Sequence, residues 1–252
     1  MDYKFCALTN LGKVRQNNED AYFATEKEGV FMVADGMGGH KAGEIASSMT
    51  REILSQRLVT RSTTDPQEPI LREAFLEANG KVREKAATAP EFEGMGCTCA
   101  VLALRESEFF LAHVGDSRIY LHRKGALKQV TRDHSYVEEL FIRGLISEEE
   151  KVDHPYKHQI TRYIGCSSKL EVDITSGPLW NGDVFLLCTD GLTEEVGAPK
   201  LQEIFDRNLD PEPTADLLIK EALNNGGRDN VTVIVVRITG KKTSFFKKIL
   251  GW

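Results

Sequence analysis

The chain has 252 residues, of which 41% are hydrophobic and 28% charged, a composition that suits one large globular domain. Its net charge of −6 argues against a broad nucleic-acid-binding face, because a surface that follows a phosphate backbone normally carries excess Lys and Arg. No apolar segment approaches the roughly 20 residues of a membrane-spanning helix, and no signal peptide is recognisable, so we expect a cytoplasmic protein.

Short apolar runs typical of strands recur along the chain, most of them bounded by Gly, Asn, Asp or Ser. They are too close together for repeated βαβ units. The runs cover residues 3–10, 29–35, 96–104, 108–116, 118–123, 183–190 and 230–238.

Helical spacing of apolar residues appears in pairs of segments. The first pair covers residues 42–58 and 69–87, joined by a polar loop, and the second covers residues 199–207 and 211–223. Strands in runs and helices in pairs indicate an α+β fold, with a mostly antiparallel core covered by helices.

Residues 133–165 are more polar and irregular. We expect one or two short helices there, in a surface subdomain near a site. The histidines in this region match no metal-binding spacing, so we expect solvated side chains at His134, His154 and His158.

Residues 241–252 form a basic tail in which aromatic and aliphatic residues are interleaved with lysines. The tail either lies on a membrane surface or a partner as an amphipathic helix, or packs on the chain's own surface.

The five cysteines form neither a CxxC pair nor an even framework. Since two of them lie in apolar, strand-like runs, we expect reduced and mostly buried thiols without zinc. These residues are Cys6, Cys97, Cys99, Cys166 and Cys188.

Aspartates stand where strand-like runs end or begin, each close to a glycine: Asp35, Asp116, Asp190 and Asp229. A single one is typical of a turn or a helix cap. If the strands lie side by side, however, their ends bring several negative charges together, and such a cluster repels itself strongly without cations. Ligation by oxygen alone favours Mg²⁺ or Mn²⁺. The stretch VADGMGGHKAGEIAS begins at the end of the run 29–35, and its glycines follow Asp35. It matches neither common phosphate-loop pattern, and an aspartate before the glycines also points to a metal site.

A set of ordered motifs makes the chain resemble the metal-dependent Ser/Thr protein phosphatases of type 2C, bacterial branch, from about residue 3 to residue 238. The motifs are RQNNED, VADGMGGHKAGEIAS, GDSRIY, TRDHS, CTDGLTEEV and GGRDNVTVIVV. The resemblance implies a four-layer α/β/β/α sandwich of two antiparallel sheets flanked by helix pairs. It also implies a phosphatase domain over residues 1–240, with a flap at about 133–165 and the tail beyond it.

The resemblance further implies two core Mn²⁺ or Mg²⁺ ions, and a third, weaker one, that activate water for in-line attack on phosphorus. By resemblance Asp35 bridges the core ions and the Gly36 carbonyl ligates one of them. Asp20 supports the metal ligands by hydrogen bonding. The resemblance also implies that Asp190 and Asp229 bind the first ion and that Glu19 binds the second. Asp116 and Asp190 would bind the third ion, and Arg15 would bind the substrate phosphate.

The donor of the proton to the departing serine or threonine oxygen stays open. Eukaryotic members carry a histidine two residues after the bridging aspartate, where this chain has Met37. His40 is the nearest substitute as general acid, and a metal-bound water is the alternative.

The implied function is hydrolysis of phosphoserine and phosphothreonine in proteins, in opposition to a bacterial Ser/Thr kinase. We expect a monomer whose partners are that kinase and its phosphorylated substrates, with no nucleic acid and with weak membrane or partner contact through the tail. The alternatives are a phosphatase dedicated to one regulator, an inactive module that binds phosphoproteins, and an oxygen-ligated metal nuclease. The negative net charge argues against the nuclease. The inactive module is disfavoured because Asp35, Asp190 and Asp229 are all present.

Overall fold

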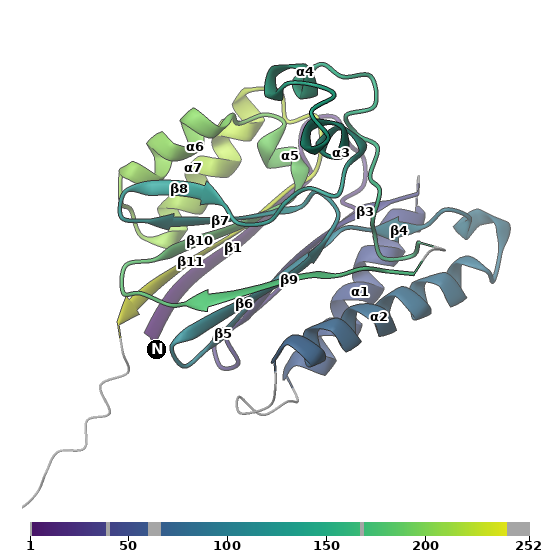
Figure 1. Ribbon diagram of the computed structural model, residues 1–252, viewed down its shortest axis with the longest axis horizontal. Coiled ribbons are helices and arrows are strands. Elements are labelled where there is room, and N and C mark those ends of the chain that lie inside the picture. The colour runs from purple at the N-terminus through teal and green to yellow at the C-terminus, as the bar shows by residue number, and fades with distance from the viewer. Residues whose placement is uncertain (1, 39–40, 60–66, 167–168, 241–252) are drawn as a thin grey trace, which may run out of the picture.

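The computed structural model describes residues 2–38, 41–59, 67–166 and 169–240. Two antiparallel sheets lie face to face, and helices cover the outer face of each (Figure 1). The predicted α+β sandwich is therefore confirmed. His40 and the basic tail, residues 241–252, lie outside the described residues.

The first sheet has the strand order β1-β11-β10-β7-β8, so the first and last strands of the described chain are neighbours. Its strands are β1 (Asp2–Asn10), β7 (Arg118–Arg123), β8 (Ala126–Gln129), β10 (Val184–Cys188) and β11 (Val231–Gly240). Each pairs antiparallel with its neighbour.

The second sheet has the order β2-β3-β5-β6-β9, and a short strand, β4, also pairs with β3. Its strands are β2 (Asp20–Thr25), β3 (Val30–Met37), β4 (Gly96–Cys97), β5 (Cys99–Arg105), β6 (Glu108–Val114) and β9 (Asp173–Pro178). The predicted single strand over residues 96–104 is thus two strands, interrupted at Thr98.

The helices fall into a pair on each outer face and a group at the ends of the strands (Figure 1). The paired helices are α1 (Lys41–Val59) with α2 (Gln67–Ala86), and α6 (Ala198–Asp206) with α7 (Pro211–Asn224). The shorter ones are α3 (Tyr136–Ile142), α4 (Glu148–Val152), α5 (Asp190–Thr193) and a 3₁₀ turn at Pro90–Phe92. Both predicted helix pairs are present, with ends shifted by at most two residues.

Apolar side chains fill three layers, one between the sheets and one under each helix pair. On β3, Phe31 and Val33 face the layer between the sheets, whereas Met32 and Ala34 face α1 and α2. Because both faces of a central strand are covered, its sequence is a continuous apolar run rather than an alternating one. The α2 residues Leu71, Phe75, Ala78 and Val82 are all buried, as their helical spacing predicts.

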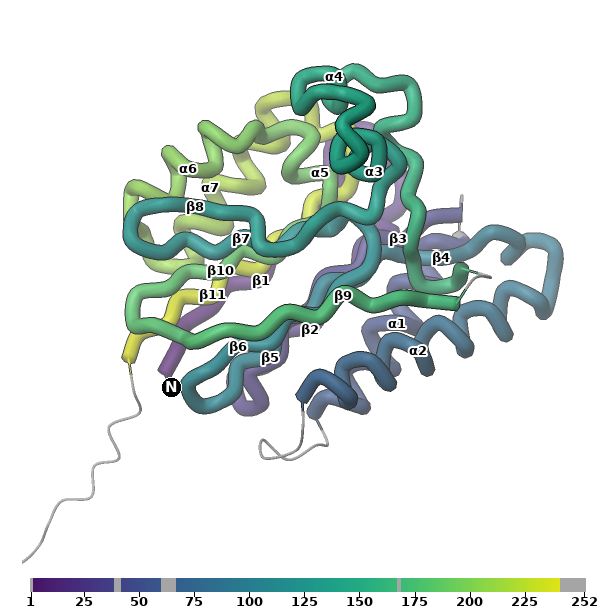
Figure 2. Tube along the Cα trace, viewed as in Figure 1, coloured from purple at the N-terminus to yellow at the C-terminus, as the bar shows by residue number. Residues whose placement is uncertain are grey.

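Residues 133–165 contain α3 and α4, and Figure 2 shows the chain rising from β8 into them and returning along the side of the molecule to β9. The two arms of this segment meet at its base, where Ser135 pairs with Ile160. The returning arm is joined to β4 through a bridge between Ile164 and Cys97.

All five cysteines are free thiols, four of them buried and Cys6 half-buried, as predicted. Within the residues that the structure describes, no helix is long and apolar enough to cross a membrane.

Candidate active site

The strand-end aspartates gather where the ends of the two sheets meet. Asp35 lies near the end of β3 and pairs across the ladder with Asp20 at the start of β2. Asp190 opens α5 directly after β10, Asp229 precedes β11, and Asp116 lies in the turn from β6 to β7. The expectation that neighbouring strand ends bring these carboxylates together is confirmed, because their charges act on one another.

Electrostatics in this cluster favours protonated carboxyls when no cation is present. Burial raises the pKa of Asp35 well above its usual range, and the charges of Asp190 and Asp20 raise it further. Burial and neighbouring aspartates likewise raise the pKa of Asp20 to about 7 and that of Asp116 to about 8. Burial also raises the pKa of Asp190. A bound cation would reverse these shifts by stabilising the ionised carboxylates.

Two buried carboxylate oxygens have no hydrogen-bond partner among the described residues, Asp20 Oδ1 and Asp190 Oδ1. The other oxygen of Asp20 accepts hydrogen bonds from Thr189 Oγ1 at 2.9 Å and Thr232 Oγ1 at 2.6 Å. Asp20 therefore belongs to one sheet and is held by the other. Unpaired buried oxygens beside further carboxylates are a donor set that fits a hard divalent cation.

Thr98 explains both the interruption between β4 and β5 and the fixed place of Asp35. Its amide donates to the Asp35 carbonyl at 2.9 Å, and its hydroxyl accepts from the Asp35 amide at 3.0 Å. The same hydroxyl lies 2.6 Å from Ser117 Oγ in the turn that carries Asp116. The residue that leaves the strand pairing thus positions two of the acidic residues.

The glycines of the β3-to-α1 segment allow close backbone packing around the cluster. A Cβ on Gly36 would lie 2.2 Å from the Gly43 carbonyl oxygen, and one on Gly43 would lie 2.6 Å from Glu19 Oε2. On the opposite side, a Cβ on Gly191 would lie 2.0 Å from the Asn230 carbonyl oxygen. These contacts leave no room for a side chain, so the motif brings Glu19 and Asp35 close together.

Arg15 lies in the loop between β1 and β2. It lines a pocket together with Gln16, Asn17, Glu19 and Asn230. Its guanidinium is about half exposed and contacts Asp229, with Nη2 2.6 Å from Oδ2. An exposed guanidinium beside the acidic cluster can hold the oxygens of a phosphate group.

Asn230 is a site residue that sequence reasoning missed. Its side chain accepts from the Glu19 amide at 2.8 Å and donates to the carbonyls of Leu11 and Asn17, both at 2.9 Å. It is 4% exposed and directly follows Asp229. The loop that carries Arg15 and Glu19 is therefore fastened to the turn that carries Asp229. The only sequence signal was its place in the GGRDNVTVIVV motif.

Glu195 is a second missed residue, and it links the Asp190 helix to the Asp229 turn. Its carboxylate accepts from the Arg228 amide at 3.1 Å and from the Arg228 guanidinium at 2.8 and 3.2 Å. The Arg228 ion pair lowers the pKa of Glu195, so this carboxylate stays ionised.

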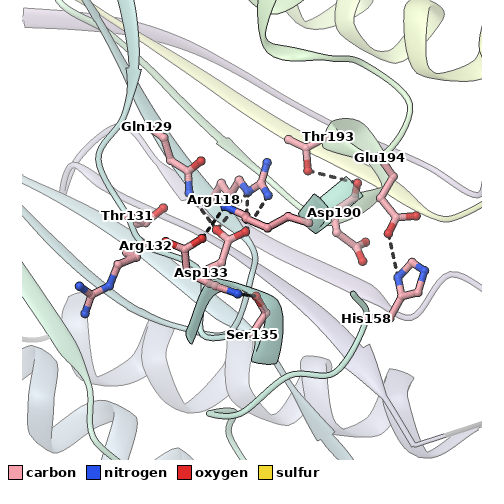
Figure 3. A network of polar contacts seen from close by, with 12 residues as sticks. Arg118, Gln129, Thr131, Arg132, Asp133, Ser135, His158, Asp190, Thr193 and Glu194 are labelled. Carbon is pink, nitrogen blue, oxygen red and sulfur yellow. Dashed lines mark hydrogen bonds and ion pairs between the residues drawn. The ribbon is translucent and has the colours of Figure 1, made fainter. Parts of the chain in front are cut away.

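The three histidines of residues 133–165 differ in burial, and Figure 3 shows the exposed one, His158, beside Glu194. His158 is exposed and reaches toward α5, with its Nδ1 2.9 Å from Glu194 Oε1. His154 is half-buried beside the Tyr136 and Tyr156 rings. The expectation of a solvated side chain is wrong for His134, which is 3% exposed because β6 and β9 cover it.

Figure 3 also shows how the TRDHS segment is attached to the first sheet. The Arg118 guanidinium donates to both oxygens of Asp133, at 2.6 to 3.0 Å, and Gln129 donates to the same carboxylate at 2.8 Å. Ser135 then caps the start of α3 by accepting from the Glu138 amide.

The fold and this acidic centre agree with the family comparison. A family model described as protein phosphatase 2C matches residues 12–225, so the chain belongs to the protein phosphatase 2C family and is a serine/threonine phosphatase. Over 234 residues it is 37% identical to the serine/threonine phosphatase stp of Listeria monocytogenes, covering 90% of this chain and 93% of that protein.

Solved structures give the same result. The serine/threonine phosphatase PstP/Ppp of Mycobacterium tuberculosis superposes with a TM-score of 0.89 at 33% identity, over 95% of this chain and all of that one. A structure of the PstP catalytic domain in complex with two manganese ions has a TM-score of 0.86 at 34% identity, over 94% of this chain and 99% of that one. Metal dependence is therefore a property of the family, and the substrates are phosphorylated proteins.

Proposed function

We propose that the chain hydrolyses phosphoserine and phosphothreonine in proteins at a centre of two Mn²⁺ or Mg²⁺ ions and opposes a bacterial Ser/Thr kinase. The observation that carries this proposal is the cluster of buried aspartates with unpaired oxygens beside an exposed arginine. When bound, the ions would lower the pKa of a shared water, so that it can attack phosphorus near neutral pH.

The proposed ligands are those that the family resemblance implies, and the clustering of the carboxylates supports them. The charges of Asp190 and Asp20 both act on Asp35, which suits a ligand shared by the two core ions. The other proposed ligands are Asp190 and Asp229 for the first ion, Glu19 for the second, the Gly36 carbonyl for one of these two ions, and Asp116 with Asp190 for a third. Asp20, which accepts hydrogen bonds from Thr189 and Thr232, would orient the metal ligands.

Arg15 would hold the substrate phosphate over this centre. Asn230 fastens the backbone of the Arg15 loop to the Asp229 turn, and the Arg15 guanidinium contacts Asp229 at 2.6 Å, so the fold keeps Arg15 beside the proposed metal ligands. A guanidinium at this place would both orient the phosphate and offset the charge that develops in the transition state.

The direct test is hydrolysis of a phosphothreonine peptide with EDTA, Mg²⁺ or Mn²⁺. We expect activity only with a divalent ion, and no cleavage of single-stranded or duplex DNA under the same conditions. Folded protein that binds the phosphopeptide without hydrolysing it under any metal condition would favour the binding-module alternative.

We also propose that the chain acts as a cytoplasmic monomer and that residues 133–165 form a flap that controls access of protein substrates. The segment stands beside α5 and contacts it through His158 and Glu194. Size-exclusion chromatography with light scattering tests the monomer, because a mass above that of one chain would contradict it.

Removal of the flap should change substrate use without removing the metal centre. Tyr136 and Gln159 are hydrogen-bonded through their backbones at 2.8 Å, so a short Asn-Gly turn can join them in place of residues 137–158. We expect KM for a phosphoprotein to rise about tenfold, a loss of roughly 1.4 kcal/mol of binding, with little change in KM for p-nitrophenyl phosphate. Equal KM values for the phosphoprotein in both forms would reject the flap role.

A further inference from the structure

His134 and Gly115 are joined by two hydrogen bonds. The His134 amide donates to the Gly115 carbonyl at 2.9 Å, and the Gly115 amide donates to the ring atom Nδ1 of His134 at 3.2 Å. Gly115 directly precedes Asp116 and has a φ of +98°, and a Cβ there would lie 2.6 Å from the Thr98 side chain. The backbone that carries Asp116 is therefore held between His134 and Thr98.

The hydrogen-bond partners decide the tautomer of His134. Because the Gly115 amide can only donate, Nδ1 must be the acceptor, and the ring hydrogen must be on Nε2. Nε2 lies 3.2 Å from Asp173 Oδ2, to which it donates. Arg162 holds the other oxygen of Asp173, with its Nη1 at 3.0 Å from Oδ1. Burial lowers the pKa of His134 to about 4, so the ring is neutral near neutral pH.

His113 completes this cluster, but the arrangement does not suit a metal ion. The His113 and His134 rings are stacked, with centroids 4.6 Å apart and planes inclined by 16°. His113 Nε2 lies 2.9 Å from the Arg132 carbonyl oxygen, to which it donates. Parallel rings direct their lone pairs side by side rather than toward one point, and Arg162 already neutralises Asp173. The cluster is therefore a hydrogen-bonded support.

We propose that His134 is a positioning residue that, through the bond from the Gly115 amide to its Nδ1, fixes the Asp116 carboxylate for the weakest of the metal ions. The inference rests on the proposed role of Asp116 in the third site. It gives the flap base a direct connection to that site, since His134 stands at the start of residues 133–165.

Paired substitutions separate this role from a general contribution to stability. In His134→Asn the side-chain carbonyl can take the place of Nδ1 and accept from Gly115, whereas contact with Asp173 is lost. In His134→Gln the longer side chain reaches toward Asp173, and the acceptor for Gly115 is lost. Both variants lose ring stacking on His113, so they are matched in packing.

The readout is Mn²⁺ binding measured by titration calorimetry and by the electron paramagnetic resonance signal of free Mn²⁺. We expect His134→Gln to weaken the weakest binding step about tenfold, and His134→Asn to stay within threefold of wild type. Thermal unfolding in EDTA should show similar losses for both variants. Arg143→Gln, in the same segment, serves as the control because the Arg143 side chain is exposed, and it should change neither measurement.

The Asp116→Ala background distinguishes the possible failures. If Asp116→Ala removes the weakest binding step, His134→Gln should have no further effect in that background. If Asp116→Ala leaves all binding steps intact, the third site and this inference both fail, while the two-ion function stands. If Asp116→Ala removes the step but both His134 variants bind Mn²⁺ equally, His134 has only a structural role and the inference is overturned.

Discussion

An Asp190→Ala variant should lose about a thousandfold in kcat/KM with Mn²⁺ and yet unfold at a higher temperature than wild type in EDTA. The loss corresponds to roughly 4 kcal/mol of transition-state stabilisation. The gain follows because Asp190 is a buried carboxylate with an unpaired oxygen, in repulsive contact with other aspartates. Lower activity together with higher thermal stability would show that Asp190 serves catalysis and destabilises the folded protein when no metal is bound.

The measurements are steady-state hydrolysis of a phosphothreonine peptide and thermal unfolding with and without Mn²⁺. Asp216→Ala, an exposed aspartate on α7, is the matched control and should leave both unchanged. A variant that is inactive and also less stable in EDTA would indicate a structural role for Asp190 instead.

Metal binding should stabilise the wild-type protein more strongly as the pH rises. In EDTA the folded state holds protons on Asp20 up to about pH 7 and on Asp116 up to about pH 8. An unfolded chain releases the same protons near pH 4. Between these limits the folded state binds more protons, so the free energy of unfolding falls as pH rises, by about 1.4 kcal/mol per pH unit for each such proton.

Thermal unfolding at pH 5.5, 7.0 and 8.5, with EDTA or saturating Mn²⁺, tests this expectation. The buried histidines His113 and His134 act in the opposite direction at low pH, because burial lowers their pKa values. They contribute equally with and without metal, so the difference in unfolding temperature isolates the acidic cluster. We expect that difference to grow by at least about 3 °C from pH 5.5 to 8.5, and a constant difference would show that the cluster does not titrate.

The central strands and both helix pairs could be predicted because each leaves a strong pattern in the sequence. The strands that were missed, β2, β8 and β9, all lie at sheet edges. Edge strands have a neighbour on one side only and keep more polar or exposed residues, as in ALKQ of β8 and DITSGP of β9. No continuous apolar run marks β8 or β9, so propensity alone could not find them, whereas β2 was missed although it carries the short apolar run AYFA.

The site was predictable as far as its residues belong to recognisable motifs. Local patterns gave the aspartates at strand ends, and the motif order gave Arg15 and Glu19. The contributions of Thr98, Asn230 and Glu195 consist of hydrogen bonds to backbone atoms far away in the sequence. His134 was misjudged for the same reason, since its neighbours His113 and Asp173 come from two other elements. Such contacts depend on tertiary packing, which residue types and spacing do not express.

The pairing of β1 with β11 has a consequence for how the enzyme is made. β1 is synthesised before every other described element, but its neighbour in the sheet, β11, is synthesised after all of them. Until then β1 has no strand to pair with, and the turn that holds Asp229 and Asn230 is missing. The nascent chain therefore cannot dephosphorylate proteins before β11 has left the ribosome and paired with β1.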